Sequence, residues 1–380
     1  MRRITGNLAR AALDMLFPLW GRKTVSQDGY TIVVPTPSDM PFLLKAFFRA
    51  VLHTDLTHCQ AILVVPDGRC SDMASLHGVM DECRTLPTPV RLLPLTRLQR
   101  FAANHWPSKD GGANIRHWLT IIRGVGAAHT THVILHDIDA FWHTADTFET
   151  LYDECRQLNC DALGLSARWD QCFTDRNIKM PGTWELTFRT EWATRFRASD
   201  HKGGMRSEKH ASDMSFDTML WPQFHSYDTG RIRISQTPPR ITHFNGTITT
   251  FRVFELPMGQ GIVDELFRVL LLSVIETAVN QGACNRLTPG LESLERGLTN
   301  LDARVRFDSE TNRRGYAEFR NMVDQMIESP AFCGNPGHSI NLQLRQFDEH
   351  FGYVRGKPHT PALTANQIRE HNLGQRKPDR

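Results

Sequence analysis

Several features that mark other protein classes are missing from this sequence. No apolar run is long enough to cross a bilayer, since the most apolar stretch, residues 267–279, is short and contains Arg268 and Glu276. The eight cysteines are scattered and form no Cys-x-x-Cys pair. That spacing argues against a zinc ribbon or a disulfide framework and favours reduced thiols in a cytosolic protein. No internal repeat is present.

A strong excess of one charge is also absent. Lysine and arginine total 44 against 41 aspartate and glutamate, so the net charge is +3. We therefore expect no nucleic-acid partner, while an anionic small substrate is compatible with this balance. The 380 residues are 40% hydrophobic and 22% charged, which fits one large soluble domain or two of moderate size.

Residues 1–23 combine basic and apolar side chains, because Arg2, Arg3 and Arg10 precede the apolar segment 11–20. Asp14 and the lack of a small-residue cleavage pattern argue against a signal peptide. Two interpretations stay open: a helix docked on the domain, which we favour, or a basic amphipathic helix on a membrane surface. We expect a cytoplasmic protein, with peripheral contact at the inner face of the membrane as the second possibility.

Apolar runs alternate with segments of helical period through the first half of the chain. The expected strands are residues 31–34, 61–65, 91–95, 133–135 and 162–165, and the expected helices are residues 40–52, 71–84 and 113–125. This alternation predicts an α/β domain with a mostly parallel central sheet. Ligands of such sheets bind beyond the carboxyl ends of the strands, where Pro35, Thr36, Asp67 and the aspartates after residue 135 would gather.

Two carboxylates, Asp137 and Asp139, follow the apolar run 133–135. In an extended chain, residues i and i+2 point to the same side, so the two groups repel each other unless a cation lies between them. Mg²⁺ or Mn²⁺ is the natural candidate, because such ions bind carboxylate and phosphate oxygens. The alternative is a solvated turn in which the aspartates cap the next segment; the apolar flanks favour the metal.

Later segments supply further candidate site residues. His243 follows a short expected strand at residues 240–244 and could be a third metal ligand. Asp213 and Asp217 are four residues apart, which would place both carboxylates on one face at the start of a helix. Trp184 follows a Pro-Gly pair and is a candidate for stacking on a sugar or base, with core packing as the alternative.

The remaining expectations concern the organisation of the chain. We expect a helix at residues 186–196, a polar mobile loop at residues 198–212, and helices at residues 263–281, 291–305 and 314–328. The predicted divisions are an N-terminal helix at 1–28, a catalytic domain at 29–258, a helical region at 259–355 and a poorly ordered basic tail at 356–380. The helical region could pack on the domain or support oligomer formation.

Taken in order, these residues resemble a nucleotide-sugar glycosyltransferase of the A-type fold over residues 31–250 or so. The resemblance implies a single Rossmann-like nucleotide-diphospho-sugar transferase domain with a C-terminal helical extension. It implies that Asp137, Asp139 and His243 bind Mn²⁺ or Mg²⁺, with Asp137 also at the ribose. It further implies that Pro35, Thr36 and Asp67 hold the nucleotide's base. It implies that Asp213 takes the proton of the acceptor hydroxyl, with Asp217 as the other candidate.

The activity implied by the resemblance is that of a metal-dependent, hexosyltransferase-type enzyme. Such an enzyme moves a sugar from a nucleotide-diphosphate donor, UDP-sugar being favoured, to a hydroxyl of a glycan or lipid-linked acceptor. The alternative is a non-catalytic sugar- or nucleotide-binding protein with the same fold. The sequence leaves the donor, the acceptor and the choice between inversion and retention open.

Overall fold

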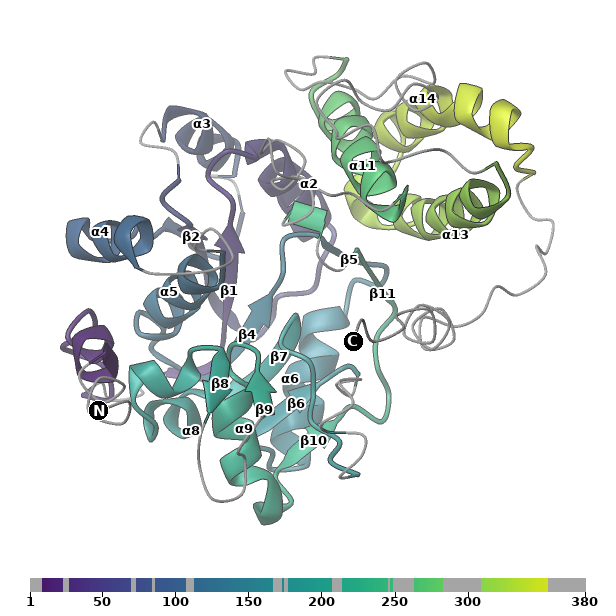
Figure 1. Cartoon of the computed structure of the whole chain (residues 1–380). Coiled ribbons are helices and arrows are strands. Elements are labelled where there is room, and N and C mark those ends of the chain that lie inside the picture. The colour runs from purple at the N-terminus through teal and green to yellow at the C-terminus, as the bar shows by residue number, and fades with distance from the viewer. Residues whose placement is uncertain are drawn as a thin grey trace, which may run out of the picture. The chain divides into compact units, whose positions relative to one another are not determined.

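The computed structural model describes residues 9–22, 27–69, 73–83, 86–106, 113–166, 173, 177–206, 214–244, 247–248, 263–282 and 309–354. The chain forms two compact units. The first comprises Met1–His243 with Ser329–Ala331, and the second comprises Phe244–Glu328 with Phe332–Arg380. Figure 1 shows their helices and strands, coloured along the chain.

A seven-stranded sheet, in the order β10-β6-β7-β4-β1-β2-β3, forms the centre of the first unit (Figure 1). The strands are β1 (Gln27–Thr36), β2 (Cys59–Pro66), β3 (Val90–Leu92), β4 (Thr130–His136), β6 (Ala162–Gly164), β7 (Glu185–Arg189) and β10 (Ile232–Ile234). All neighbouring pairs are parallel except those of β7, which runs antiparallel to both β4 and β6. The expected α/β class with a mostly parallel central sheet is confirmed.

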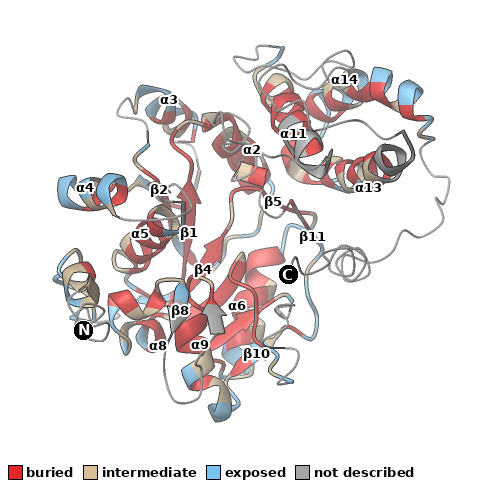
Figure 2. Cartoon of the chain, in the orientation of Figure 1, coloured by how far each residue is buried: buried red, intermediate tan, exposed pale blue. Residues whose placement is uncertain are grey.

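The central strands are buried on both faces, which explains their nearly continuous apolar sequences (Figure 2). Val33 of β1 and Leu135 of β4 are fully buried, and α5 (Ala113–Val125) packs on this core through residues such as Leu119. Close approach of the helix depends on Gly124, where an added Cβ would lie 2.3 Å from Val33 Cγ1. The helix and the sheet therefore fit together at a position that has no side chain.

The other described helices of this unit surround the sheet. They are residues 9–14, α2 (Pro41–Val51), α3 (Ala74–Glu82), α4 (Arg97–His105), α6 (Thr147–Gln157), α8 (Thr190–Thr194) and α9 (Leu220–Ser226), with the 3₁₀ turns η1 (Ala198–His201) and η2 (Tyr227–Thr229). The three helices expected from periodicity correspond to α2, α3 and α5. The sequence analysis did not single out α4 or α6, although α4 begins with a capping box between Thr96 and Gln99.

Two local expectations are wrong. Residues 186–196 are not one helix, because β7 pairs with β4 and leaves just the short α8 after it. Residues 214–216 do not start a helix either: they form β9 (Met214–Phe216), which pairs with β8 (Gly204–Arg206) inside the segment expected to be a loop. In both cases strand pairing prevails over local helical periodicity: β7 pairs with the distant β4, and β9 pairs with the nearby β8.

The second unit contains three described helices, α11 (Val263–Val279), α13 (Ser309–Ile327) and α14 (Asn335–Phe351). The expected helices at 263–281 and 314–328 are confirmed, while residues 291–305 and 356–380 lie outside the described residues. Helix α14 was not predicted from the sequence, because its Asn-Pro-Gly start has the composition of a turn. Tyr316 of α13 donates to Asp348 Oδ1 of α14 at 2.8 Å and stacks on Phe351. Within the described part of the chain, no helix is both long enough and apolar enough to span a membrane.

Candidate metal centre

Three side chains converge at the carboxyl edge of the sheet. Asp137, Asp139 and His243 each offer one ligand atom, and these atoms all lie within 4.8 Å of one another. His243 Nε2 is 3.5 Å from Asp139 Oδ1 and 3.9 Å from Asp137 Oδ2. Asp137 is mostly buried, with 23% of its side chain exposed, against 9% for Asp139 and 11% for His243. The structure therefore brings together the three residues predicted to bind a metal.

The backbone at Asp137 and Asp139 differs from the extended strand end that their spacing predicts. Asp137 follows β4 directly, and its carbonyl accepts a hydrogen bond from Ala140 N at 3.0 Å, which makes residues 137–140 a tight turn. The short strand β5 (Ala140–Trp142) then pairs antiparallel with β11 (Ile241–His243), with His243 opposite Ala140. The turn aligns the two carboxylates, and the β5–β11 pairing adds the imidazole.

Trp184, the residue just before β7, holds the other side of the cluster. Its indole stacks on the His243 imidazole, with ring centroids 4.5 Å apart. Its carbonyl accepts from Asp137 N at 3.0 Å. Gly182 leaves room for this indole, because an added Cβ there would lie 3.2 Å from Cδ1 and from Nε1. Stacking of Trp184 on a sugar or base stays a prediction.

Several carboxylates act on one another in and around the cluster. The pKa of Asp137 is raised well above its usual value, first by burial and then by the charges of Asp139, Glu185 and Asp217. A bound divalent cation would remove this penalty. Ligand atoms on one octahedral ion of this kind lie about 3 to 4 Å apart, given metal–ligand distances near 2.1 Å. The spacing of the cluster and its donor set of two carboxylates and one imidazole thus fit Mn²⁺ or Mg²⁺.

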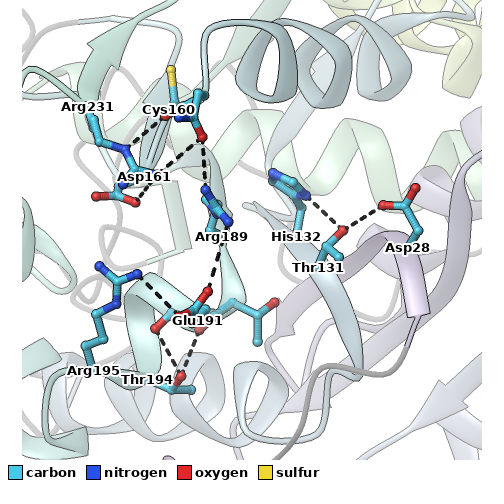
Figure 3. Close-up of polar contacts among 12 residues, drawn as sticks. Asp28, Thr131, His132, Cys160, Asp161, Arg189, Glu191, Thr194, Arg195 and Arg231 are labelled. Atoms are coloured by element: carbon cyan, nitrogen blue, oxygen red, sulfur yellow. Dashed lines mark hydrogen bonds and ion pairs between the residues drawn. The ribbon is translucent and has the colours of Figure 1, made fainter.

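The opposite edge of the sheet shows the contrast (Figure 3). There Asp161 lies beside Arg231, with Oδ1 2.9 Å from Nη2, and Glu191 lies beside Arg195 at 3.4 Å. Asp28 accepts a hydrogen bond from the Thr131 hydroxyl in the same view. These carboxylates each lie beside a cation or a hydroxyl, whereas Asp137 and Asp139 lie beside each other and His243.

A buried pair, His136 and Glu185, lies next to the turn at residues 137–140. His136 Nδ1 and Glu185 Oε2 are 2.7 Å apart, and both side chains are fully buried. The β4–β7 register places these two residues directly opposite each other, and the His136 ring packs against Phe47 and Trp142. The sequence analysis did not single out either residue. The sequence could have pointed to Glu185 because it follows the candidate site residue Trp184. The contact between Glu185 and His136, however, depends on the pairing of β4 with β7.

Asp217 is the described candidate for the acceptor's base. It follows β9 and lies close enough to raise the pKa of Asp137 and of His117 on α5. Its Oδ1 accepts from Thr218 N at 2.8 Å. Burial, the largest cause, lowers the pKa of His117 overall. Asp213 lies outside the described residues. His117 was not predicted from the sequence as a site residue, although it lies in the first turns of α5, which begins at the carboxyl edge of the sheet.

The residues predicted to hold the nucleotide base also lie at the carboxyl ends of the strands. Pro35 and Thr36 end β1 and are buried, and the Thr36 carbonyl accepts from Asp67 N at 2.9 Å. Asp67 Oδ1 accepts from Ser38 N and Oγ at 3.1 and 2.8 Å, and Oδ2 lies 3.5 Å from Arg69 Nε. These bonds tie two strand-end loops together, and contact with a base stays a prediction.

Comparison with known proteins returns matches among solved structures. No protein-family model and no curated protein sequence matches the chain. The TarS 1–349 structure from S. aureus matches with a TM-score of 0.36 and 10% identity, covering 88% of this chain and 99% of that one. A mannosyltransferase from Pyrobaculum calidifontis, in complex with GDP-Man and Mn²⁺, matches with a TM-score of 0.36 and 14% identity, covering 98% of this chain and 90% of that one.

The galactosyltransferase LgtC, in complex with donor and acceptor sugar analogues, gives a TM-score of 0.37 and 14% identity over 54% of this chain and 73% of that one. All three TM-scores are below 0.5.

Proposed function

We propose that this chain is a metal-dependent glycosyltransferase of the hexosyltransferase type. It takes a sugar from a nucleotide-diphosphate donor, UDP-sugar being favoured, and transfers it to a hydroxyl of a glycan or lipid-linked acceptor. The observation that carries this proposal is the Asp137–Asp139–His243 cluster at the carboxyl edge of a mostly parallel sheet. This edge is where open α/β sheets bind their ligands.

The proposed reaction breaks the bond between the anomeric carbon and a diphosphate oxygen. A bound Mn²⁺ or Mg²⁺ would supply positive charge where the diphosphate leaves. Asp139 and His243 would hold the ion, and Asp137 would complete the set of protein ligands. The tight turn and the Trp184 stack fix these ligands before substrate arrives, so little reorganisation is needed at the moment of reaction.

The proposed role of the acidic residues near the cluster is to take the proton of the acceptor hydroxyl. In an inverting reaction, a carboxylate takes the proton of the acceptor hydroxyl as the oxygen attacks the anomeric carbon. Asp217, whose charge acts on Asp137, is one candidate for this role, and Asp213 is the other. A retaining reaction would need no base at this position.

The test compares the wild type with Asp139→Ala on a panel of UDP- and GDP-sugars in the presence of Mn²⁺. Donor hydrolysis and transfer should fall on the order of a hundredfold or more, as expected when a leaving group loses its charge stabiliser. The control is Asp146→Ala, an exposed aspartate before α6 with no side-chain capping bond. It should keep wild-type rates.

Two results would contradict the proposal. Asp139→Ala could turn over donors as fast as the wild type, in which case the metal assignment is wrong. Alternatively, the wild type could bind nucleotide sugars with Mn²⁺ and turn none of them over, which would make the chain a non-catalytic binding protein. Binding is measured separately by the rise in melting temperature with each donor.

A further inference from the structure

Two neighbouring elements of the first unit, residues 9–22 and α4, expose four large apolar side chains; the exposed positions of α4 are pale blue in Figure 2. They are Met15, 68% exposed, Leu19, 65%, Leu98, 57%, and Phe101, 60%. Only three other large apolar side chains in the described part of the chain are comparably exposed: Leu52, Leu342 and Val354. The Gln99 side chain donates to the Leu16 carbonyl at 3.1 Å, so the two elements lie side by side.

The helix α4 has two distinct faces. Gln99 and Ala103 are buried against the unit, while Arg97, Leu98 and Phe101 are exposed. Phe101 stacks on His105 of the same helix, with ring centroids 4.2 Å apart. An ordinary solvated face would carry polar residues at these positions. The mixture of apolar and basic side chains on the outer face instead suits an interface between water and hydrocarbon.

Basic side chains outnumber acidic ones in both elements. No acidic residue lies between Glu82 and Asp110, whereas this stretch contains Arg84, Arg91, Arg97, Arg100 and Lys109. Residues 1–22 contain four arginines and one acid, Asp14. Asp14 Oδ1 accepts from Ser199 N at 2.8 Å, so this carboxylate turns toward the unit. In the described residues 9–22 and α4, the four arginines Arg10, Arg22, Arg97 and Arg100 therefore outnumber the one acid, although the whole chain is nearly neutral.

We propose that Met15, Leu19, Leu98 and Phe101, with the arginines around them, dock on the surface of an anionic lipid bilayer. The four apolar side chains enter the boundary between headgroups and acyl chains, and the arginines face lipid phosphates. A nucleic acid would pair with the arginines but would leave these apolar side chains in water. This inference does not depend on the proposed glycosyl transfer.

The experiment is vesicle flotation of the full chain with two lipid compositions, pure phosphatidylcholine and phosphatidylcholine with about a third phosphatidylglycerol. The wild type should float with the anionic vesicles and much less with the neutral ones. Leu98→Ser with Phe101→Ser should lower binding at least about tenfold. Arg22→Gln and Arg97→Gln should each lower it about fivefold. Leu342→Ser, at an exposed leucine of α14, is the matched control and should bind as the wild type does.

Three results would overturn the proposal: no flotation of the wild type with anionic vesicles, equal flotation with both compositions, or unchanged binding of the Leu98→Ser, Phe101→Ser pair. Circular dichroism checks that each variant is folded. Should that pair fail to fold, Met15→Ser with Leu19→Ser decides instead. The second pair removes the apolar contacts from the other element, with the same expected loss and the same contradicting result.

Discussion

The indole of Trp184 lies against the imidazole of His243, with centroids 4.5 Å apart and ring planes 20° from parallel. This contact restricts rotation of the imidazole whose Nε2 faces Asp139. A metal ligand that is held in place before binding loses less entropy when the ion arrives, and supporting residues of this kind are typically worth 10- to 100-fold in affinity.

We therefore expect Trp184→Ala to weaken Mn²⁺ binding about tenfold or more, measured by isothermal titration calorimetry. Trp184→Phe keeps an aromatic ring over His243 and should recover most of the loss. Trp106→Phe, on a half-buried tryptophan at the end of α4, should leave Mn²⁺ affinity unchanged. Full Mn²⁺ affinity in Trp184→Ala would show that the stack is packing without influence on the ligand.

The second prediction concerns the carboxylate of Asp217. Asp217→Asn should lower the rate of transfer by about 10²- to 10⁴-fold if this residue is the acceptor's base. Mn²⁺ affinity should change little, because Asp217 is not one of the three clustered ligands. Asp228→Asn, on the exposed turn η2, is the control. Loss of transfer in Asp213→Asn alone would move the role to that residue, and no loss in either variant would point to a retaining reaction.

The third prediction is a loss of stability in mild acid that originates at His132. Burial, followed by the charge of Arg189, lowers the pKa of His132 to about 4, and the residue is 7% exposed. The unfolded chain has a histidine pKa near 6.5, so protons bind the unfolded state first as the pH falls. The stabilisation by neutral His132 is complete above pH 6.5 and is lost as the pH falls toward 4.

At pH 5 this loss is about 2 kcal/mol, from the difference between the two pKa values. Urea unfolding at pH 7 and pH 5 measures it. His132→Gln should remove that part of the pH dependence, whereas His105→Gln on the exposed side of α4 should not. Identical pH slopes for His132→Gln and the wild type would show that His132 titrates normally in the folded protein.

The fourth prediction uses two helical glycines as a matched pair. Gly124→Ala would place a methyl group 2.3 Å from Val33 Cγ1, and so should destabilise the protein by about 1–3 kcal/mol through overpacking. Gly78→Ala, within α3, meets nothing within 4 Å and should stabilise by about 0.5–1 kcal/mol. Chemical denaturation of the two variants and the wild type measures both changes in the free energy of unfolding. A stabilised Gly124→Ala variant would contradict the close packing of α5 on β1.

The sequence by itself determined the alternation of strands and helices and the placement of polar residues after strands. Val133–Leu135 is apolar and buried because β4 is covered on both faces, and this local pattern also points to Asp137 and Asp139. The same reasoning failed at residues 186–196 and 213–217, where helical periodicity predicted helices and the chain forms β7 and β9. A short segment carries too little information to outweigh strand pairing, whether the partner is far away in sequence, as β4 is from β7, or close, as β8 is to β9.

Tertiary structure alone decided how the site is assembled. His243 reaches Asp139 because β11 pairs with β5, and Trp184 reaches His243 because β7 runs antiparallel beside β4. Neither pairing has a local signature, since register depends on which faces become buried once all the strands are present. The residue types of the site can thus be found by spacing along the chain, whereas their contacts arise from backbone hydrogen bonds between segments that are distant in sequence.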